Sequence, residues 1–166
     1  SCYLLPKKPN KFGVRNLREV LHIKKAIAPE KEAMINLLYT SNLIFDEMNA
    51  ITKQFDISIQ QFNVLRILNG ADDSKVNMNY IQKRMIHKMS NTTRLIDKLT
   101  DKELVERNVC YNNRRKIEVK ISQKGISLLN EINNLVDYKE KSICQNLNND
   151  ELLAFNHTLN KLRPNE

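Results

Sequence analysis

Most hydrophobic positions of the chain recur at the three- and four-residue spacing that is typical of helices. This spacing predicts a short helix over 14–27 and long amphipathic helices over about 30–55, 125–143 and 150–163. Residues 116–121 differ, because they alternate strictly between polar and apolar side chains, as half-buried strands do. The pattern therefore predicts a mostly α-helical chain with one small β-hairpin.

Residues 57–70 carry the clearest local signal for a helix with defined ends. Ser58 and Gln61 have the spacing of a capping box, in which each side chain binds the backbone of the other residue. Ile57 and Phe62 are placed as the hydrophobic staple around that box. Gly70 is expected to end the helix in the left-handed conformation.

The segment after residue 76 predicts the order helix, helix, strand, basic loop and strand. Asn77 can cap a short helix over 78–85, and a second helix begins around Met89 or Ser90. The second helix is expected to bury Leu95, Ile96 and Leu99, with polar and basic side chains opposite: Asn91, Thr92, Arg94, Lys98 and Lys102. This order describes a winged helix-turn-helix, a module that presents one helix and one hairpin tip to a duplex.

Positive charge is confined to two parts of the chain. Residues 83–124 hold twelve Lys or Arg against five Asp or Glu, so the net charge of this window is +7, and the net charge of the whole chain is +8. Residues 1–28 carry +6 and read as a basic arm with a short helix, whereas the remaining segments are mildly acidic. Such segregation favours a polyanionic partner over a uniformly solubilising surface. The arm can contact phosphates or remain a disordered tail.

Several function classes are disfavoured by what the sequence contains. The three cysteines and three histidines are widely scattered, so we expect no disulfide framework, no metal site and no cofactor. With three glycines in all, no glycine-rich phosphate loop can form, and we expect no catalytic residues and no enzyme. No apolar run approaches the length that crosses a bilayer, so no membrane contact and a cytoplasmic location are expected.

The predicted terminal helices carry more apolar surface than a small winged-helix lobe can cover. We therefore divide residues 29–163 into a DNA-binding lobe over 57–124 and dimerisation helices over 29–55 and 125–163. A two-fold homodimer would place two recognition helices about 34 Å apart on a palindromic operator in double-stranded DNA.

The candidate DNA-binding residues fall into two groups. Asn91, Thr92 and Thr93 are short polar side chains near a helix start and can reach base edges, whereas Arg94 and Lys98 suit phosphates. Ser90 is either a cap or a contact. The hairpin tip supplies the second group, of which the arginines can enter a minor groove: Asn112, Asn113, Arg114 and Arg115.

The order of these parts resembles MarR-type transcriptional regulators, a winged-helix family that acts as dimers. The resemblance covers about 30–163 and rests on the recognition-helix pattern of residues 90–107, followed by Arg114-Arg115 and the Ser122-x-x-Gly125 motif. It implies a repressor whose small, often aromatic or anionic, effector binds between the dimerisation helices and the DNA-binding lobe. The other class kept open is a winged-helix adaptor that binds a protein and has lost specific DNA binding.

The chain also departs from the family pattern at several positions. Glu103 stands where the family usually has glycine, and Gln82 and Ile86 stand where small residues are usual. Asn113 replaces the wing acid that pairs, in the family, with the arginine matching Arg94. Some relatives sense oxidants through a cysteine in the first long helix. That helix has none here, and Cys110 is either an ordinary strand residue or a reactive thiol.

Overall fold

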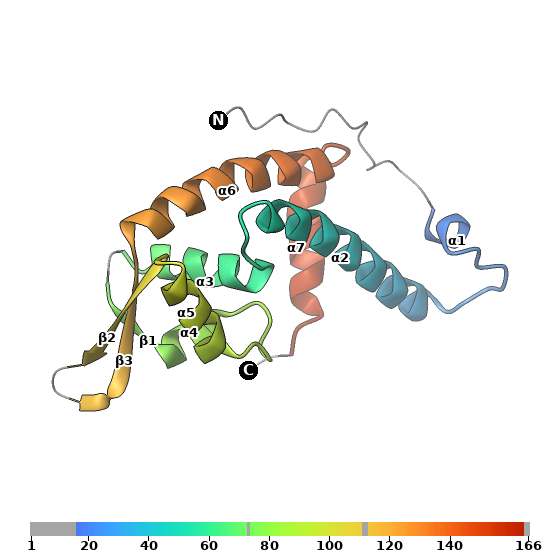
Figure 1. Ribbon diagram of the computed structural model, residues 1–166. Coiled ribbons are helices and arrows are strands. Elements are labelled where there is room, and N and C mark those ends of the chain that lie inside the picture. Colours follow the sequence, from blue (N-terminus) through green and yellow to red (C-terminus); the bar gives the residue numbers. More distant parts are fainter. Residues whose placement is uncertain (1–15, 73, 111–112, 165–166) are drawn as a thin grey trace. The chain divides into compact units, whose positions relative to one another are not determined.

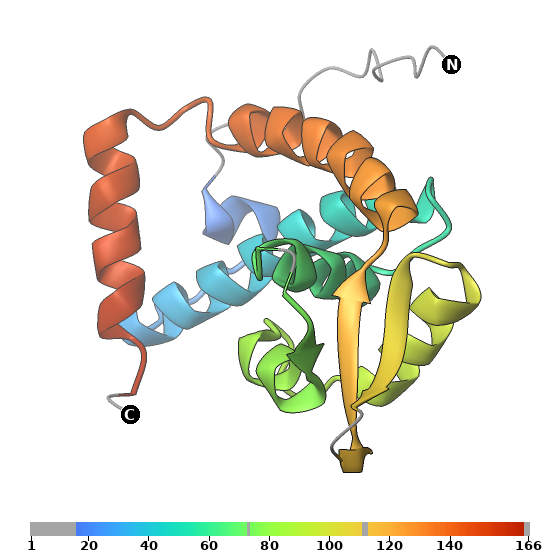
Figure 2. The same cartoon turned by 90° about the vertical axis from the view of Figure 1, so that its left-hand side faces the viewer.

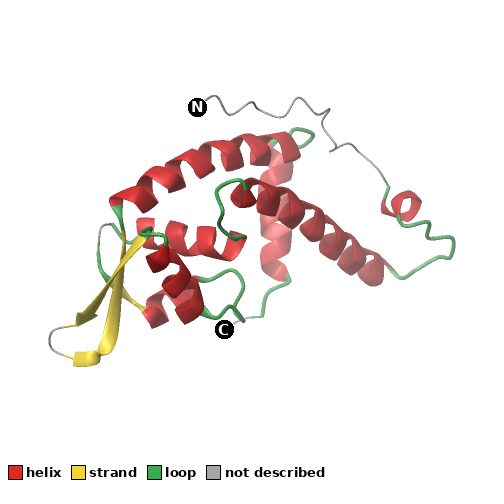
Figure 3. Ribbon diagram, in the orientation of Figure 1, coloured by secondary structure: helices red, strands yellow, loops and turns green. Residues whose placement is uncertain are grey.

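The computed structural model describes residues 16–72, 74–110 and 113–164, with no description of side chains at 109–116. In chain order, the elements are α1 (Leu17–Val20), α2 (Pro29–Lys53), α3 (Ile59–Asn69), β1 (Val76–Asn77), α4 (Met78–Arg84), α5 (Thr92–Asp101), β2 (Val105–Cys110), β3 (Asn113–Ile121), α6 (Gln123–Ile143) and α7 (Asn149–Lys161) (Figure 1). The predicted class, mostly helical with a small hairpin, is confirmed (Figure 3). Among the helices of this described part, none is long and apolar enough to cross a membrane.

The chain divides into two compact units. One unit is Tyr39–Val136, and the other contains the described residues before Tyr39 and after Val136. The division falls within α2 and within α6. The central unit contains α3, α4, α5 and the whole β-sheet, which are the parts of a winged helix-turn-helix.

The sheet of the central unit has three antiparallel strands in the order β1-β3-β2, with β3 in the middle (Figure 2). The predicted hairpin corresponds to β2 and β3, which pair from Val105 opposite Ile121 to Cys110 opposite Asn113. The two-residue β1 was not predicted, because two residues are too few to produce an alternating pattern. Its pairing of Val76 with Val119 anchors the segment before α4 to the sheet.

The core of this unit is assembled from all of its helices and from the base of the sheet. Its fully buried side chains include Leu65 and Leu68 of α3, Ile81 of α4, and Ile96 and Leu99 of α5. Val119 of β3 and Leu129 and Ile132 of α6 complete the same cluster. Burial of such apolar side chains contributes roughly 1.5–3 kcal/mol each, so the recognition helix is held mainly by its apolar face.

The helix α3 begins as predicted and ends differently. Ser58 and Gln61 form the capping box, and Ile57 and Phe62 are both buried in the core. Gly70 has φ of −74°, so the predicted left-handed glycine cap is wrong. The left-handed residue in the following turn is Asp72, with φ of 47°. Asp tolerates this conformation better than most residues, and the turn therefore needs no glycine there.

The helix α5 ends in a left-handed turn at Glu103, the position where glycine is usual in the resembled family. Glu103 has φ of 61°. Its amide donates to the Thr100 carbonyl at 2.8 Å, and the Leu104 amide donates to the Leu99 carbonyl at 2.9 Å. These two bonds make a Schellman motif, which satisfies the last carbonyls of the helix. A glutamate in the left-handed region costs free energy that glycine would not.

The start of α6 packs directly against this turn. The Ser122 hydroxyl donates to the Glu103 carbonyl at 2.7 Å and accepts from the Gly125 amide at 3.0 Å. The Ser122 amide donates to the Leu104 carbonyl at 3.1 Å. A Cβ added to Gly125 would lie 2.1 Å from that same carbonyl oxygen. The Ser122-x-x-Gly125 motif thus joins the end of α5, the sheet and α6 at one point.

The other unit contains α1 and α7 with the adjoining ends of α2 and α6. The predicted helix over 14–27 is limited to α1, because His22 adopts a left-handed φ of 52° and ends it. Arg18 of α1 forms a bidentate pair with Glu32 of α2, with Nε–Oε1 at 2.9 Å and Nη2–Oε2 at 2.7 Å. Hydrogen bonding to Arg18 lowers the pKa of Glu32.

Replacing Gly125 with Ala is expected to lower the free energy of unfolding by about 2 kcal/mol, because the new methyl group forces two backbone segments apart. Chemical denaturation of the two proteins measures this difference. The matched control is Gly70→Ala, because its added Cβ would lie 3.5 Å from the nearest atom and its φ is ordinary. Equal stabilities of the two variants would contradict the close approach described above.

Candidate nucleic-acid interface

Three of the polar side chains predicted to contact DNA are exposed at the start of α5: Asn91, Thr93 and Arg94. Asn91 is the N-cap, and its side chain accepts from the Arg94 amide at 3.1 Å. The helix starts at Thr92, so the predicted start at Met89 or Ser90 is wrong by two or three residues. Ser90 is half-buried, and its amide binds the His87 carbonyl at 3.0 Å. Ser90 was predicted to be either a cap or a DNA contact, and the structure shows that the cap of this helix is Asn91.

Thr92 does not lie on the exposed face where it was predicted. It is 6% exposed, and its hydroxyl donates to Oε1 of Gln82. The spacing contains the signal for this, because Thr92 precedes the buried Ile96 and Leu99 by four and seven residues, along one helical stripe. Thr92 therefore holds α5 in place, and the exposed residue beside it is Thr93.

Gln82 links three parts of the helix-turn-helix. Besides accepting from Thr92 of α5, its Nε2 donates to the Lys88 carbonyl in the turn at 2.7 Å, and Gln82 itself belongs to α4. A small residue, usual here in the resembled family, would make neither bond. Gln82 therefore joins α4 to α5 and to the intervening turn through two hydrogen bonds.

The turn between α4 and α5 is also in contact with α2 and α3. The Ile86 amide donates to Oδ1 of Asn63 in α3 at 3.0 Å. The His87 ring meets Phe45 of α2 edge to face, with ring centroids 5.6 Å apart. These contacts fix the backbone of the turn against α2 and α3, and so they fix the start of α5.

Three ion pairs connect the second half of α5 and the turn that follows it to neighbouring segments. Arg107 of β2 binds Asp97 at 2.6 Å, Lys102 binds Asp56 in the turn after α2, and Lys124 of α6 binds Glu103 at 2.8 Å. Lys102, which the sequence places on the polar face of this helix, is therefore bound to a carboxylate. Hydrogen bonding to Lys102 and Lys124 lowers the pKa values of Asp56 and Glu103 respectively.

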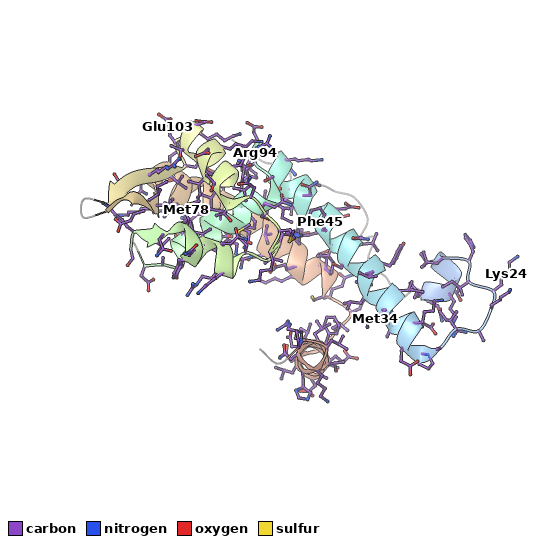
Figure 4. The ribbon with its side chains drawn as sticks, turned by 90° about the horizontal axis from the view of Figure 1, so that it is seen from below. Lys24, Met34, Phe45, Met78, Arg94 and Glu103 are labelled. Atoms are coloured by element: carbon purple, nitrogen blue, oxygen red, sulfur yellow. The ribbon has the colours of Figure 1, made fainter. Side chains whose placement is uncertain are left out.

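Two cations of α5 remain exposed outside these ion pairs. Arg94 lies in the first turn and Lys98 in the last, and neither side chain has an ion-pair or hydrogen-bond partner among the residues that the structure describes. Figure 4 shows Arg94 in the first part of α5 and Glu103 beyond its end. Internal pairs thus neutralise part of the +7 charge of residues 83–124, and Arg94 stays exposed beside Thr93.

The second group of residues predicted to bind DNA belongs to the tip of the hairpin. Asn112 lies outside the described residues, as do the side chains of Cys110, Asn113, Arg114 and Arg115. The β2–β3 ladder carries a register shift between Val109 and Cys110. Such irregularities bend a strand and increase its twist.

A helix-turn-helix followed by a two-stranded wing defines a winged-helix protein. Within this class, residues 57–117 match the family model described as MarR family. The chain therefore contains a MarR-family domain, and the family resemblance predicted from its sequence is confirmed.

Solved structures with the same fold agree with this assignment. A MarR transcription factor from Planctomyces limnophilus is 29% identical, with a TM-score of 0.64 over 82% of this chain and 98% of that chain. A mutant MarR from E. coli, complexed with operator DNA, is 24% identical, with a TM-score of 0.71 over 84% and 100%. The S. aureus MepR–DNA complex is 21% identical, with a TM-score of 0.72 over 78% and 94%.

The pairing of Glu103 with Lys124 predicts a pH-dependent contribution to stability. Because the pKa of Glu103 is lowered in the folded state, its contribution is present above the unfolded-state pKa of about 4.3 and is lost as pH falls through the folded-state value. Glu103→Gln should therefore be less stable than the wild type at pH 6, and this difference should disappear by about pH 3.

Thermal unfolding across this pH range measures the effect. The control is Glu131→Gln, which removes a carboxylate that has no ion pair within the described part of the chain. A stability difference for Glu103→Gln that stays constant with pH would exclude the ion pair as its cause.

Proposed function

We propose that this protein is a dimeric, sequence-specific DNA-binding transcription regulator, and that it acts as a repressor released by a small molecule. The observation that carries the proposal is the division between paired and unpaired cations around α5. Lys102, Arg107 and Lys124 are held in ion pairs, whereas Arg94 and Lys98 of α5 are exposed without one among the described residues, and Arg94 follows the exposed Thr93. A helix that keeps exposed cations and short polar side chains suits the phosphates and base edges of a major groove.

In this proposal, Thr93 and the amide group of Asn91 read base edges, and Arg94 and Lys98 bind phosphates. Thr92 does not contact DNA in this proposal and instead positions α5, because its hydroxyl donates a hydrogen bond to Gln82. Arg114 and Arg115 are proposed to enter the adjacent minor groove from the wing. The DNA complexes of the E. coli and S. aureus relatives support this use of the fold.

Dimerisation is proposed through the terminal helices. The helix α7 has no buried residue in the single chain, although it carries Leu153, Phe155 and Leu162 at exposures of 68%, 50% and 55%. Exposed apolar surface of this kind marks association, and a two-fold pair would present both copies of α5 to one duplex.

An effector has a candidate position in the central unit. A groove of about 560 Å³ is lined by Phe55, Asp56, Lys102, Leu104, Lys124, Ser127, Leu128 and Glu131. Its volume falls in the range of small-molecule sites. An anionic aromatic molecule bound there would compete with Asp56 for Lys102 and so would act on the pair that fixes the end of α5.

The proposal is tested by selecting bound sequences from random DNA duplexes and then measuring the affinity for the selected duplex at two salt concentrations. We expect selection of a palindromic sequence and a steep loss of affinity with salt, because phosphate neutralisation releases counterions. No binding to any duplex, together with capture of a protein partner, would favour the adaptor function.

The variant Arg94→Ala should weaken binding to the selected duplex and reduce the slope of log affinity against log salt by about 1. The control is Lys161→Ala, which removes the same charge from the exposed end of α7. Affinity titrations at several salt concentrations measure both slopes. Identical slopes for the two variants would remove Arg94 from the phosphate-binding group.

A further inference from the structure

The turn that precedes α5 carries two exposed apolar side chains. Met89 is 98% exposed and Ile86 is 75% exposed. Exposed apolar residues that occur singly need no explanation, but these two belong to one seven-residue turn, 85–91, between the helices of the helix-turn-helix. Met89 stands two residues before the N-cap Asn91, at the end of α5 that the proposed function directs to DNA.

The position of Met89 is set by a backbone that is fixed on both sides. The carbonyl of Lys88 accepts from Gln82, and the amide of Ser90 donates to the His87 carbonyl at 3.0 Å. The edge-to-face contact between His87 and Phe45 holds the same turn against α2. The Met89 side chain therefore projects into solvent from an ordered turn, so only the side chain and not the backbone has to be ordered when it meets a ligand.

The surroundings of Met89 favour a nucleic acid over an apolar protein surface. Lys83 and Lys88 precede it, and Arg94 and Lys98 follow it, whereas no acidic residue stands between Ser74 and Ile96. An apolar protein partner would have to desolvate these cations, whereas a duplex pairs them with phosphates.

The major groove of DNA offers one apolar group for direct readout, the C5 methyl of thymine. Methionine is suited to such a contact, because its thioether is polarizable and its unbranched chain adapts to the position of the methyl group. We propose that Met89 is a specificity-determining residue that contacts a thymine methyl group in each half of the operator. This inference rests on the proposed function and names a base that the turn before α5 would recognise in each half-site.

The test replaces each thymine of the selected duplex in turn with deoxyuridine, which lacks only the methyl group and keeps the hydrogen-bonding edge. For the wild-type chain, one replacement per half-site should lower affinity roughly fourfold, the effect of losing one buried methyl contact. Met89→Ala should bind the thymine duplex about as weakly and should be insensitive to that replacement. Met89→Leu, which keeps an apolar side chain, should retain part of the sensitivity.

Because Met89 is almost fully exposed, the variants are expected to fold, and circular dichroism with thermal unfolding checks this. A wild-type protein that binds DNA but responds to no replacement, or a Met89→Ala variant with unchanged thymine sensitivity, overturns the inference and leaves the proposed function standing. An unchanged affinity and sequence preference in Met89→Ala would also overturn it. A wild-type protein that binds no duplex removes both proposals.

Discussion

The close approach of Gly125 to the Leu104 carbonyl is the contact on which the geometry of the winged helix depends. It brings the left-handed turn after α5 against the first turn of α6, and the Ser122 hydroxyl bridges the two. The end of the recognition helix, the first strand of the hairpin and the helix that follows are thereby fixed at one point. A side chain at residue 125 would separate them, whatever the rest of the core contributes.

The ion pairs around α5 change how the charge of this chain is understood. A basic window suggests a continuous positive surface, but Lys102, Arg107 and Lys124 each bind a carboxylate of the same domain. Exposed pairs of this kind contribute little to stability, so their effect lies mainly in geometry and in the removal of competing positive charge. Within the described residues, the cations of α5 that stay exposed outside these pairs are Arg94 in its first turn and Lys98 in its last.

The helix-turn-helix shows how the chain departs from the pattern of the resembled family without losing the fold. Gln82 occupies a position where small residues allow close packing, and it compensates by binding both Thr92 and the backbone of the turn. Glu103 occupies a glycine position and accepts the left-handed conformation, with Lys124 bound to its side chain. In both places, a polar side chain makes contacts at a position where the resembled family usually has a small residue.

Local patterns in the sequence were enough to predict the fold class, the capping box of Ser58 and Gln61, the cap at Asn77, the hairpin and the family, because each depends on neighbours within a few residues. Tertiary structure alone decided that the Thr92 hydroxyl binds Gln82 of α4, that the turn after α3 needs no left-handed glycine, and that Lys102 binds Asp56, 46 residues away. Partners so distant leave no trace in periodicity or spacing, because they meet only when separate elements pack.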